Sequence, residues 1–297
     1  MSRIQEILKK AEREGNMQRT RSLGHHEGDW TAAAPAAAQA VIERPAPPVP
    51  LATPLIETPR VAAAAAGHAG LSPVLDSHLV AAHAPQSLAA EQYRSLRTRV
   101  KSAEQGRAMR TIIVTSPDKG DGKSLTAANL ALTMAQEPQQ RVLLIDADLR
   151  RASIHRLFGI AETPGLTDVL MGGASIDDAL VSIADHHLTV LPSGIIPMHP
   201  GELLGSAAMR RVIDTLRTRF DRILIDMPPI APLADVAIAS AMADGILVIV
   251  RAGKTTKPAI ERALSGLDMS KVLGLVLNDA GDAAAAYGYT ADGYVAR

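Results

Sequence analysis

The sequence predicts an α/β fold in which a mostly parallel sheet is covered by helices on both faces. From Thr111 onward, short apolar segments alternate with amphipathic segments almost to the C-terminus, a pattern typical of parallel sheets. Most of the apolar segments are hydrophobic at nearly every position, as expected for strands buried on both sides. The chain has 297 residues, 47% of them hydrophobic, which is enough for one domain of this kind with a sizeable appendage.

Six strands are expected. They cover residues 111–115, 141–145, 188–191, 222–226, 245–250 and 272–277. A helix is expected before the first strand, through EQYRSLRTRV, and the folded domain is predicted to span residues 88–280.

The residues before this domain differ in composition. Residues 1–15 place Ile4, Ile7, Leu8 and Ala11 at helical spacing among charged residues, which predicts a short amphipathic helix, marginal by itself. Residues 16–87 are dominated by alanine and proline. They are predicted to be a disordered linker, because prolines break regular structure and alanines bury little area. Residues 281–297 are predicted to be a flexible tail.

Composition excludes several classes of function. The formal net charge is zero, so no global basic field favours nucleic acid as a partner. The chain has no cysteine, which excludes disulfides, zinc thiolate sites and a cysteine nucleophile. The N-terminus does not resemble a secretory signal, and no apolar run approaches the ~20 residues that span a bilayer. A cytoplasmic protein without a direct membrane span is therefore expected, and any membrane role needs a partner.

A phosphate-binding turn is predicted after the first strand. The strand TIIVT leads into SPDKGDGKSLTAANLAL, so the glycines precede an amphipathic helix, as in a P-loop. Pro117 stands where the motif usually begins with glycine. In such a turn, backbone N–H groups and the helix N-terminus bind phosphate, the lysine reaches the β and γ phosphates of ATP, and the serine binds Mg²⁺. The candidate nucleotide-binding residues here are Gly120, Asp121, Gly122, Lys123, Ser124 and Leu125.

Carboxylates follow two later strands. RVLLIDADLR ends in Asp146 and Asp148, which lie on one side of an extended chain. FDRILIDMPP ends in Asp226, at the position of the carboxylate that holds Mg²⁺ in P-loop enzymes. Ligands in open α/β sheets lie beyond the carboxyl ends of the strands. We therefore expect Lys123, Asp146, Asp148 and Asp226 to form a catalytic group there, with Ser124, Asp148 and Asp226 as metal ligands.

At these motifs, KGDGKS, DADLR and DMPP, the sequence resembles the bacterial tyrosine kinases of the CpsD/CapB type, from about Leu88 to the C-terminus. The resemblance implies a protein-tyrosine autokinase that uses ATP and Mg²⁺ in exopolysaccharide or capsule synthesis and export. It implies a cytoplasmic protein recruited to the membrane by a separate membrane-embedded co-polymerase that activates it.

Further segments extend the resemblance. The family carries ExxRxxR before the first strand, used in ring-shaped oligomers, and Glu91, Arg94 and Arg97 have that spacing here. LPSGIIPMHPGELL resembles the family's LPxGxxPPNPxELL. By resemblance, the loop at Arg251 and the strand end at Asn278 are candidates for adenine contacts.

Three tyrosines near the C-terminus are candidate phosphate acceptors. The family autophosphorylates a C-terminal tyrosine cluster, and here Tyr287, Tyr289 and Tyr294 lie in AAYGYTADGYVAR. A tyrosine from a neighbouring subunit would enter the site, with Asp146 or Asp148 taking the hydroxyl proton. Each phosphate would add about 1.5–2 negative charges and oppose ring assembly.

Two other functions are compatible with the motifs. A dimeric positioning ATPase, as in septum placement or chromosome partitioning, shares the fold, but its signature lysine would occupy the position of Asp118. A nucleotide-binding scaffold of an export complex could lack phosphoryl transfer altogether. ATP turnover without phosphotyrosine would indicate the ATPase, and binding without turnover the scaffold.

Overall fold

The structure is a computed structural model that describes residues 74–104, 106–231 and 234–281. Its strands are β1 (Thr111–Thr115), β2 (Val142–Asp146), β3 (Val181–Ile183), β4 (Leu188–Leu191), β5 (Arg222–Asp226), β6 (Gly245–Arg251) and β7 (Val272–Asn278). Its α-helices are α2 (Val80–His83), α3 (Leu88–Ala103), α4 (Lys123–Ala135), α5 (Ile154–Phe158), α6 (Leu166–Leu170), α7 (Ile176–Ala179), α8 (Pro200–Leu204), α9 (Ala207–Arg219), α10 (Asp235–Ala239) and α11 (Lys257–Ser265). Single 3₁₀ turns cover Ala184–His186 and Ser240–Met242.

The seven strands form one sheet in the order β3-β4-β2-β5-β1-β6-β7. All neighbouring pairs are parallel except β3 with β4. The predicted fold class is confirmed, and the six expected strands are all present with ends within one residue of those expected. The antiparallel edge strand β3 was not expected, because its three residues are too few to show a period.

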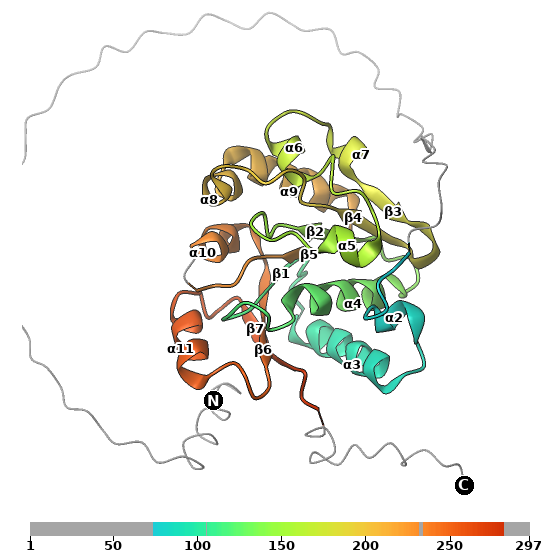
Figure 1. The fold of residues 1–297 in the computed structure, drawn as a ribbon, viewed down its shortest axis with the longest axis vertical. Helices are drawn as coiled ribbons and strands as arrows, with labels where there is room; N and C mark the ends of the chain where they lie inside the picture. Colours follow the sequence, from blue (N-terminus) through green and yellow to red (C-terminus); the bar gives the residue numbers. More distant parts are fainter. Residues whose placement is uncertain (1–73, 105, 232–233, 282–297) are drawn as a thin grey trace, which may run out of the picture. The chain divides into compact units, whose positions relative to one another are not determined.

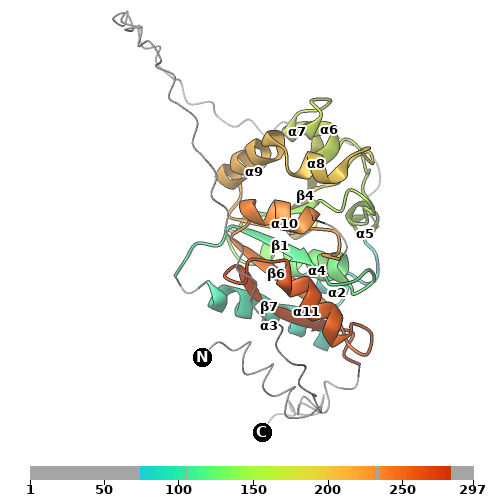
Figure 2. The ribbon, with the colours of Figure 1, turned by 90° about the vertical axis from the view of Figure 1, so that its left-hand side faces the viewer.

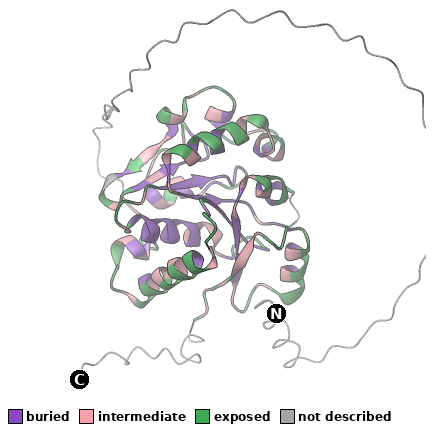
Figure 3. Cartoon of the chain, turned by 180° about the vertical axis from the view of Figure 1, so that it is seen from behind, coloured by how far each residue is buried: buried purple, intermediate pink, exposed green. Residues whose placement is uncertain are grey.

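Two hydrophobic cores lie on opposite faces of this sheet. Helices α6 to α11 contribute to the first core, and α2 to α5 contribute to the second. Figure 1 shows α9 and α10 on one side of the strands and α3 and α4 on the other, and Figure 2 shows the same layers from the side. Strands β1, β2 and β5 are buried at every position, and Figure 3 shows them as the purple centre. This double cover explains their continuous apolar sequences.

The folded region begins before the predicted boundary at residue 88. Leu79 is fully buried in the second core, and the Asn129 side chain binds the backbone of this segment at Ala81 N and His78 O. The predicted linker of residues 16–87 is therefore wrong from residue 74 onward, because tertiary contacts outweigh its Ala- and Pro-rich composition. The rest of the linker, the predicted helix at residues 1–15 and the tail from residue 282 lie outside the described residues.

Replacing Leu79 with alanine is expected to lower the free energy of unfolding by about 2–5 kcal/mol, the usual loss for a fully buried leucine. Urea denaturation of the full chain measures this change. Val74→Ala is the matched control, because Val74 is 84% exposed and its replacement should change stability by less than about 0.5 kcal/mol. Equal, small effects of both substitutions would show that residues 74–87 are not part of the core.

None of the helices in the described ranges combines the length and hydrophobicity that a bilayer crossing requires.

Candidate active site

The turn between β1 and α4 has the geometry of a phosphate-binding loop. Gly120 and Gly122 both have positive φ angles, +82° and +92°, which L-residues with side chains rarely adopt. At Gly122 there is also no space for a side chain, because an added Cβ would lie 2.0 Å from the Asn278 Nδ2 atom. The loop leads directly into the N-terminus of the 13-residue helix α4, where free N–H groups and the helix dipole favour the binding of anions.

The loop is held in shape by residues far along the chain. Asp121 is fully buried, and its carboxylate accepts hydrogen bonds from the Asp118 N–H at 3.0 Å and the Thr255 hydroxyl at 2.9 Å. Its carbonyl oxygen accepts from the Asn278 side-chain amide at 2.9 Å. The segment after β6 and the end of β7 therefore fix the loop conformation.

Two basic residues at and just after the end of β6 reinforce this contact. Arg251 forms an ion pair with Asp279 at 2.7 Å and donates to the Gly120 carbonyl at 3.3 Å, while Lys254 donates to the Lys119 carbonyl at 3.1 Å. The contacts of Arg251 and Asn278 are thus with the loop itself. Their suggested contact with adenine stays a prediction.

The three predicted carboxylates converge beside this loop. In the sheet register Asp146 of β2 pairs with Asp226 of β5, so their side chains leave the same face of neighbouring strands, roughly 4.8 Å apart. Asp146 and Asp226 are fully buried and Asp148 is 3% exposed. The predicted grouping of these residues is what the structure shows.

Lys123 is the cation that faces all three carboxylates. Its Nζ lies 2.7 Å from Asp148 Oδ2, 3.4 Å from both carboxylate oxygens of Asp226, and 3.0 Å from the Ser124 hydroxyl. Burial alone would lower the pKa of Lys123, but the attraction of Asp226 and Asp148 raises it overall. Lys123 is therefore firmly protonated, and its single charge cannot neutralise three carboxylates.

The pKa values of the two buried strand-end aspartates are both raised. Burial raises the pKa of Asp226 to about 7, although Lys123 opposes the shift. Burial also raises the pKa of Asp146 to about 6, against the stabilising effect of backbone N–H groups of Ser153 and Ile154, which donate to Oδ2 at 3.0 and 2.9 Å. A further cation at this site would relieve the repulsion between the carboxylates.

A pH dependence of stability follows. The folded protein holds protons on Asp146 and Asp226 up to about pH 6–7, whereas the unfolded chain releases them near pH 4. The folded state therefore binds more protons in this range, and its stability falls as the pH rises through it. In the absence of nucleotide and Mg²⁺, the melting temperature of the Asp226→Asn protein should fall less between pH 5 and pH 8 than that of the unmodified protein. At pH 8 the variant should have the higher melting temperature.

The matched control is Asp177→Asn, since the Asp177 side chain is 75% exposed and lies on α7. It should keep the pH dependence of the unmodified protein, as measured by thermal unfolding followed by circular dichroism. A parallel pH dependence of Asp226→Asn and the unmodified protein would contradict the raised pKa of Asp226.

A cleft of about 840 Å³ opens next to this group. Of the predicted site residues, Gly120, Gly122, Lys123, Ser124, Leu125 and Asp148 line it. Asp146 and Asp226 are fully buried, whereas Asp121, Arg251 and Asn278 make the hydrogen bonds that hold the loop. The cleft also contains Arg151 and Arg156, to which the sequence analysis assigned no role. The two consecutive arginines at residues 150–151 could have indicated Arg151 from the sequence.

Comparisons with known proteins are consistent with this geometry. A family model described as an AAA domain matches residues 109–269. The tyrosine-protein kinase YwqD of Bacillus subtilis (strain 168) is 40% identical over 206 residues, which cover 69% of this chain and 86% of YwqD. The chain belongs to the bacterial tyrosine-protein kinases.

Two other relatives agree with this assignment. The tyrosine-protein kinase CpsD of Streptococcus agalactiae is 34% identical over 201 residues, covering 67% of this kinase and 86% of CpsD. The solved kinase domain of the Escherichia coli tyrosine kinase ETK superposes with a TM-score of 0.65 at 28% identity, covering 67% of this kinase and 79% of that chain. The predicted family is confirmed, which favours tyrosine-kinase chemistry over a positioning ATPase. The P-loop domain of the kinase binds nucleotide.

Proposed function

We propose that this kinase transfers the γ-phosphate of Mg-ATP to tyrosines of its own C-terminal tail, supplied by a neighbouring subunit. The observation that carries the proposal is the contact of Lys123 with Asp148 and Asp226, because Lys123 and Asp148 also line the cleft beside the phosphate-binding loop. Phosphoryl transfer depends mainly on positioning and charge neutralisation. This group supplies both a cation for the phosphates and carboxylates for a metal.

The residues present suit Mg²⁺. Its ligands would be the Ser124 hydroxyl with Asp148 and Asp226, directly or through water, all of them oxygen donors. Across the described ranges no three His, Cys, Asp or Glu side chains form a ready metal cage. That finding agrees with Mg²⁺ in kinases and ATPases, which depends on substrate phosphates and water for its remaining ligands. When bound, the ion neutralises charge on the β and γ phosphates.

Asp146 is the better candidate for the base. Its raised pKa of about 6 brings it closer to the operating pH than an ordinary aspartate, which favours a general base. Asp148 is instead engaged with Lys123. In the proposed step, the tyrosine oxygen attacks the γ-phosphorus, its proton passes to Asp146, and the bond from that phosphorus to the β–γ bridging oxygen breaks to release ADP.

Oligomerisation through Glu91, Arg94 and Arg97 remains a proposal. Glu91 and Arg94 form an ion pair on α3, where the Glu91 side chain is 62% exposed, whereas Arg94 also donates to the Pro85 carbonyl at 2.7 Å. Arg97 donates to the Thr133 carbonyl at 2.7 Å and pairs with Glu137, which anchors α3 to the end of α4. A ring contact would therefore use the exposed Glu91 first, with Arg94 and Arg97 holding this part of the helix in place.

The cellular setting is proposed from the resemblance to the CpsD/CapB type. The kinase would act in the cytoplasm, at the inner face of the membrane, where a membrane-embedded co-polymerase activates it. It would regulate synthesis and export of an exopolysaccharide or capsule. Phosphorylation of Tyr287, Tyr289 and Tyr294 would add negative charge to the tails and release the ring.

The deciding experiment is incubation of the purified full chain with Mg-ATP, with and without a candidate membrane activator, followed by phosphotyrosine detection and peptide mapping. Phosphate should map to Tyr287, Tyr289 and Tyr294 and disappear when all three are replaced by phenylalanine. Asp146→Asn should bind ATP but lose at least about 100-fold in rate, the loss of a general base. Steady ATP hydrolysis without phosphotyrosine would instead identify a positioning ATPase.

A further inference from the structure

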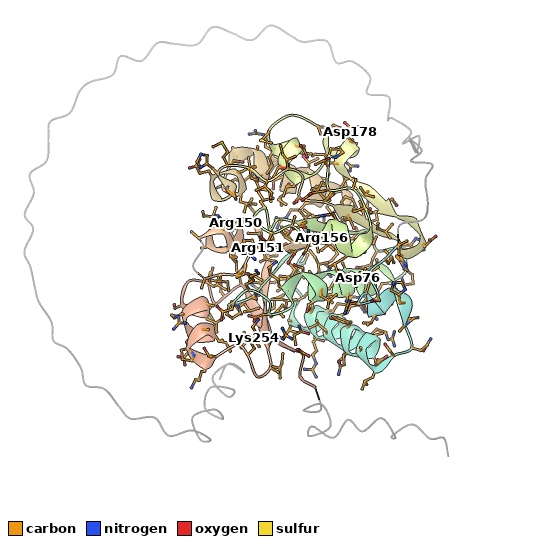
Figure 4. All side chains as sticks on the ribbon, in the orientation of Figure 1. Asp76, Arg150, Arg151, Arg156, Asp178 and Lys254 are labelled. Atoms are coloured by element: carbon orange, nitrogen blue, oxygen red, sulfur yellow. The ribbon has the colours of Figure 1, made fainter. Side chains whose placement is uncertain are left out.

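The cleft beside the phosphate-binding loop is lined by more basic than acidic residues. Its lining includes five basic residues, Lys119, Lys123, Arg150, Arg151 and Arg156, and two acidic residues, Asp148 and Glu162. Lys123 is already paired with Asp148. The three arginines come from the segment after β2 and from α5 and line the same cleft; Figure 4 labels them near the middle of the view.

These arginines differ in how far their guanidinium groups are engaged. Arg150 is held by buried Asp235, with Nε 2.9 Å from its carboxylate. Arg156 donates once, to the Ala152 carbonyl, which leaves most of its five N–H groups available. Arg151 is exposed, and its guanidinium makes no hydrogen bond or ion pair with any residue in the described part of the chain. Arg151 and Arg156 therefore retain donors for a ligand.

An apolar surface borders the same cleft. Ile196 contributes to the lining and is 68% exposed, and its neighbours Ile195 and Met198 are 51% and 92% exposed. Exposed apolar side chains beside a cleft are typical of a binding surface. A ligand that matches both features has a ring or alkyl group close to an acidic group.

We propose that Arg151, Arg156 and Ile196 form an acceptor subsite that selects tyrosines with a carboxylate a few residues away. The proposal rests on the proposed function and adds the class of acceptor to it. The arginines would bind the carboxylate by charge-assisted hydrogen bonds, and Ile196 would contact the apolar part of the acceptor. The tail of a second copy fits this description, because Asp292 lies three residues after Tyr289 and two residues before Tyr294.

The alternative is that both arginines bind the phosphates of ATP. The two roles differ in what a charge reversal changes: a phosphate contact alters the KM for ATP with every acceptor, whereas an acceptor contact depends on the charge of residue 292. The test therefore separates donor from acceptor, by mixing two full-length variants. The acceptor carries Lys123→Met, which prevents its own catalysis, and the enzyme carries phenylalanine at Tyr287, Tyr289 and Tyr294, so only transfer between chains is detected.

In this mixture, Arg151→Glu with Arg156→Glu in the enzyme should lower phosphorylation of the acceptor about tenfold or more, as expected when a charge-assisted contact becomes repulsive. The KM for ATP should stay unchanged. Asp292→Arg in the acceptor should lower transfer by the unmodified arginines and restore it with the reversed ones. Arg210→Glu, at an exposed arginine of α9, is the control and should have no effect.

Rescue by the reversed pair would also show that the doubly substituted enzyme is folded. Equal transfer to the acceptor that keeps Asp292 and to the acceptor with Asp292→Arg, or a raised KM for ATP, would overturn the acceptor subsite and leave tail phosphorylation intact. If the enzyme with its native arginines modified no tail tyrosine even with a membrane activator, both the subsite and the proposed function would be refuted.

Discussion

Replacing Lys123 with methionine is expected to lower autophosphorylation by at least about 100-fold, the loss typical when a preorganised contact to transition-state charge is removed. The lysine is the residue that contacts both Asp148 and Asp226, so methionine removes the cation and preserves only the length of the side chain. Transfer of radiolabelled phosphate from ATP to the full chain measures the rate.

The same substitution should also change stability in a pH-dependent way. Methionine leaves three buried carboxylates without their cation, which should lower the free energy of unfolding at pH 8 by about 3 kcal/mol, as for other broken buried ion pairs. At pH 5 the loss should be smaller, because Asp146 and Asp226 are largely protonated there. Lys257→Met is the control, since Lys257 is half-exposed and, among the residues that the structure describes, pairs only with Glu261 at 3.8 Å. An active Lys123→Met protein would exclude the proposed role of this lysine.

Replacing Gly122 with alanine is expected to weaken nucleotide binding by at least about tenfold, or about 1.4 kcal/mol. Two effects combine: the φ of +92° is unfavourable for alanine, and the new Cβ would lie 2.0 Å from the Asn278 side chain, which must move away from Asp121. The loop N–H groups would then no longer converge on one phosphate position. Fluorescence titration with a labelled ATP analogue, together with urea denaturation, measures affinity and stability.

Two further variants separate these effects. Gly172 also has a positive φ, +77°, but an added Cβ there meets no atom within 4 Å, so Gly172→Ala should cost only the backbone strain, about 1 kcal/mol of stability, and leave nucleotide affinity unchanged. Because Asn278→Ala removes the clash, adding Gly122→Ala to that variant should lower nucleotide affinity by less than Gly122→Ala does in the unmodified protein. No difference in nucleotide affinity between Gly122→Ala and the unmodified protein would argue against the loop as the phosphate site.

The sequence was sufficient for every strand of the sheet except β3, and for the centre of the site. Strands buried on both faces are apolar throughout, so β1, β2 and β5 could be located, and the rule that ligands bind beyond strand ends brought Lys123 together with Asp146, Asp148 and Asp226. Composition did not predict that the segment around Leu79 is folded. One buried leucine and hydrogen bonds between the backbone and the Asn129 side chain hold this segment, although its composition resembles that of a linker. Packing partners about 50 residues away leave no local pattern.

The residues that hold the phosphate-binding loop in shape could not be predicted from the sequence for the same reason. The Thr255 hydroxyl donates a hydrogen bond to Asp121, which lies 134 residues earlier in the chain. The local sequence KTTKP contains no pattern that predicts this contact. Arg151 and Arg156 could be seen in the sequence, but their common position in the cleft depends on how the chain turns into α5. Spacing predicts neighbours within one helix or strand, and contacts between loops require the fold.

The pairing of Asp146 with Asp226 on adjacent strands has a consequence for how this protein evolves. The sheet ladder keeps both residues on neighbouring buried strands, and the burial of their carboxylates, together with their mutual repulsion, lowers the stability of the ligand-free protein as the pH rises. Most proteins keep only a small margin above the stability they need. Selection for stability alone would therefore not favour these two aspartates, whereas the chemistry proposed for them requires them.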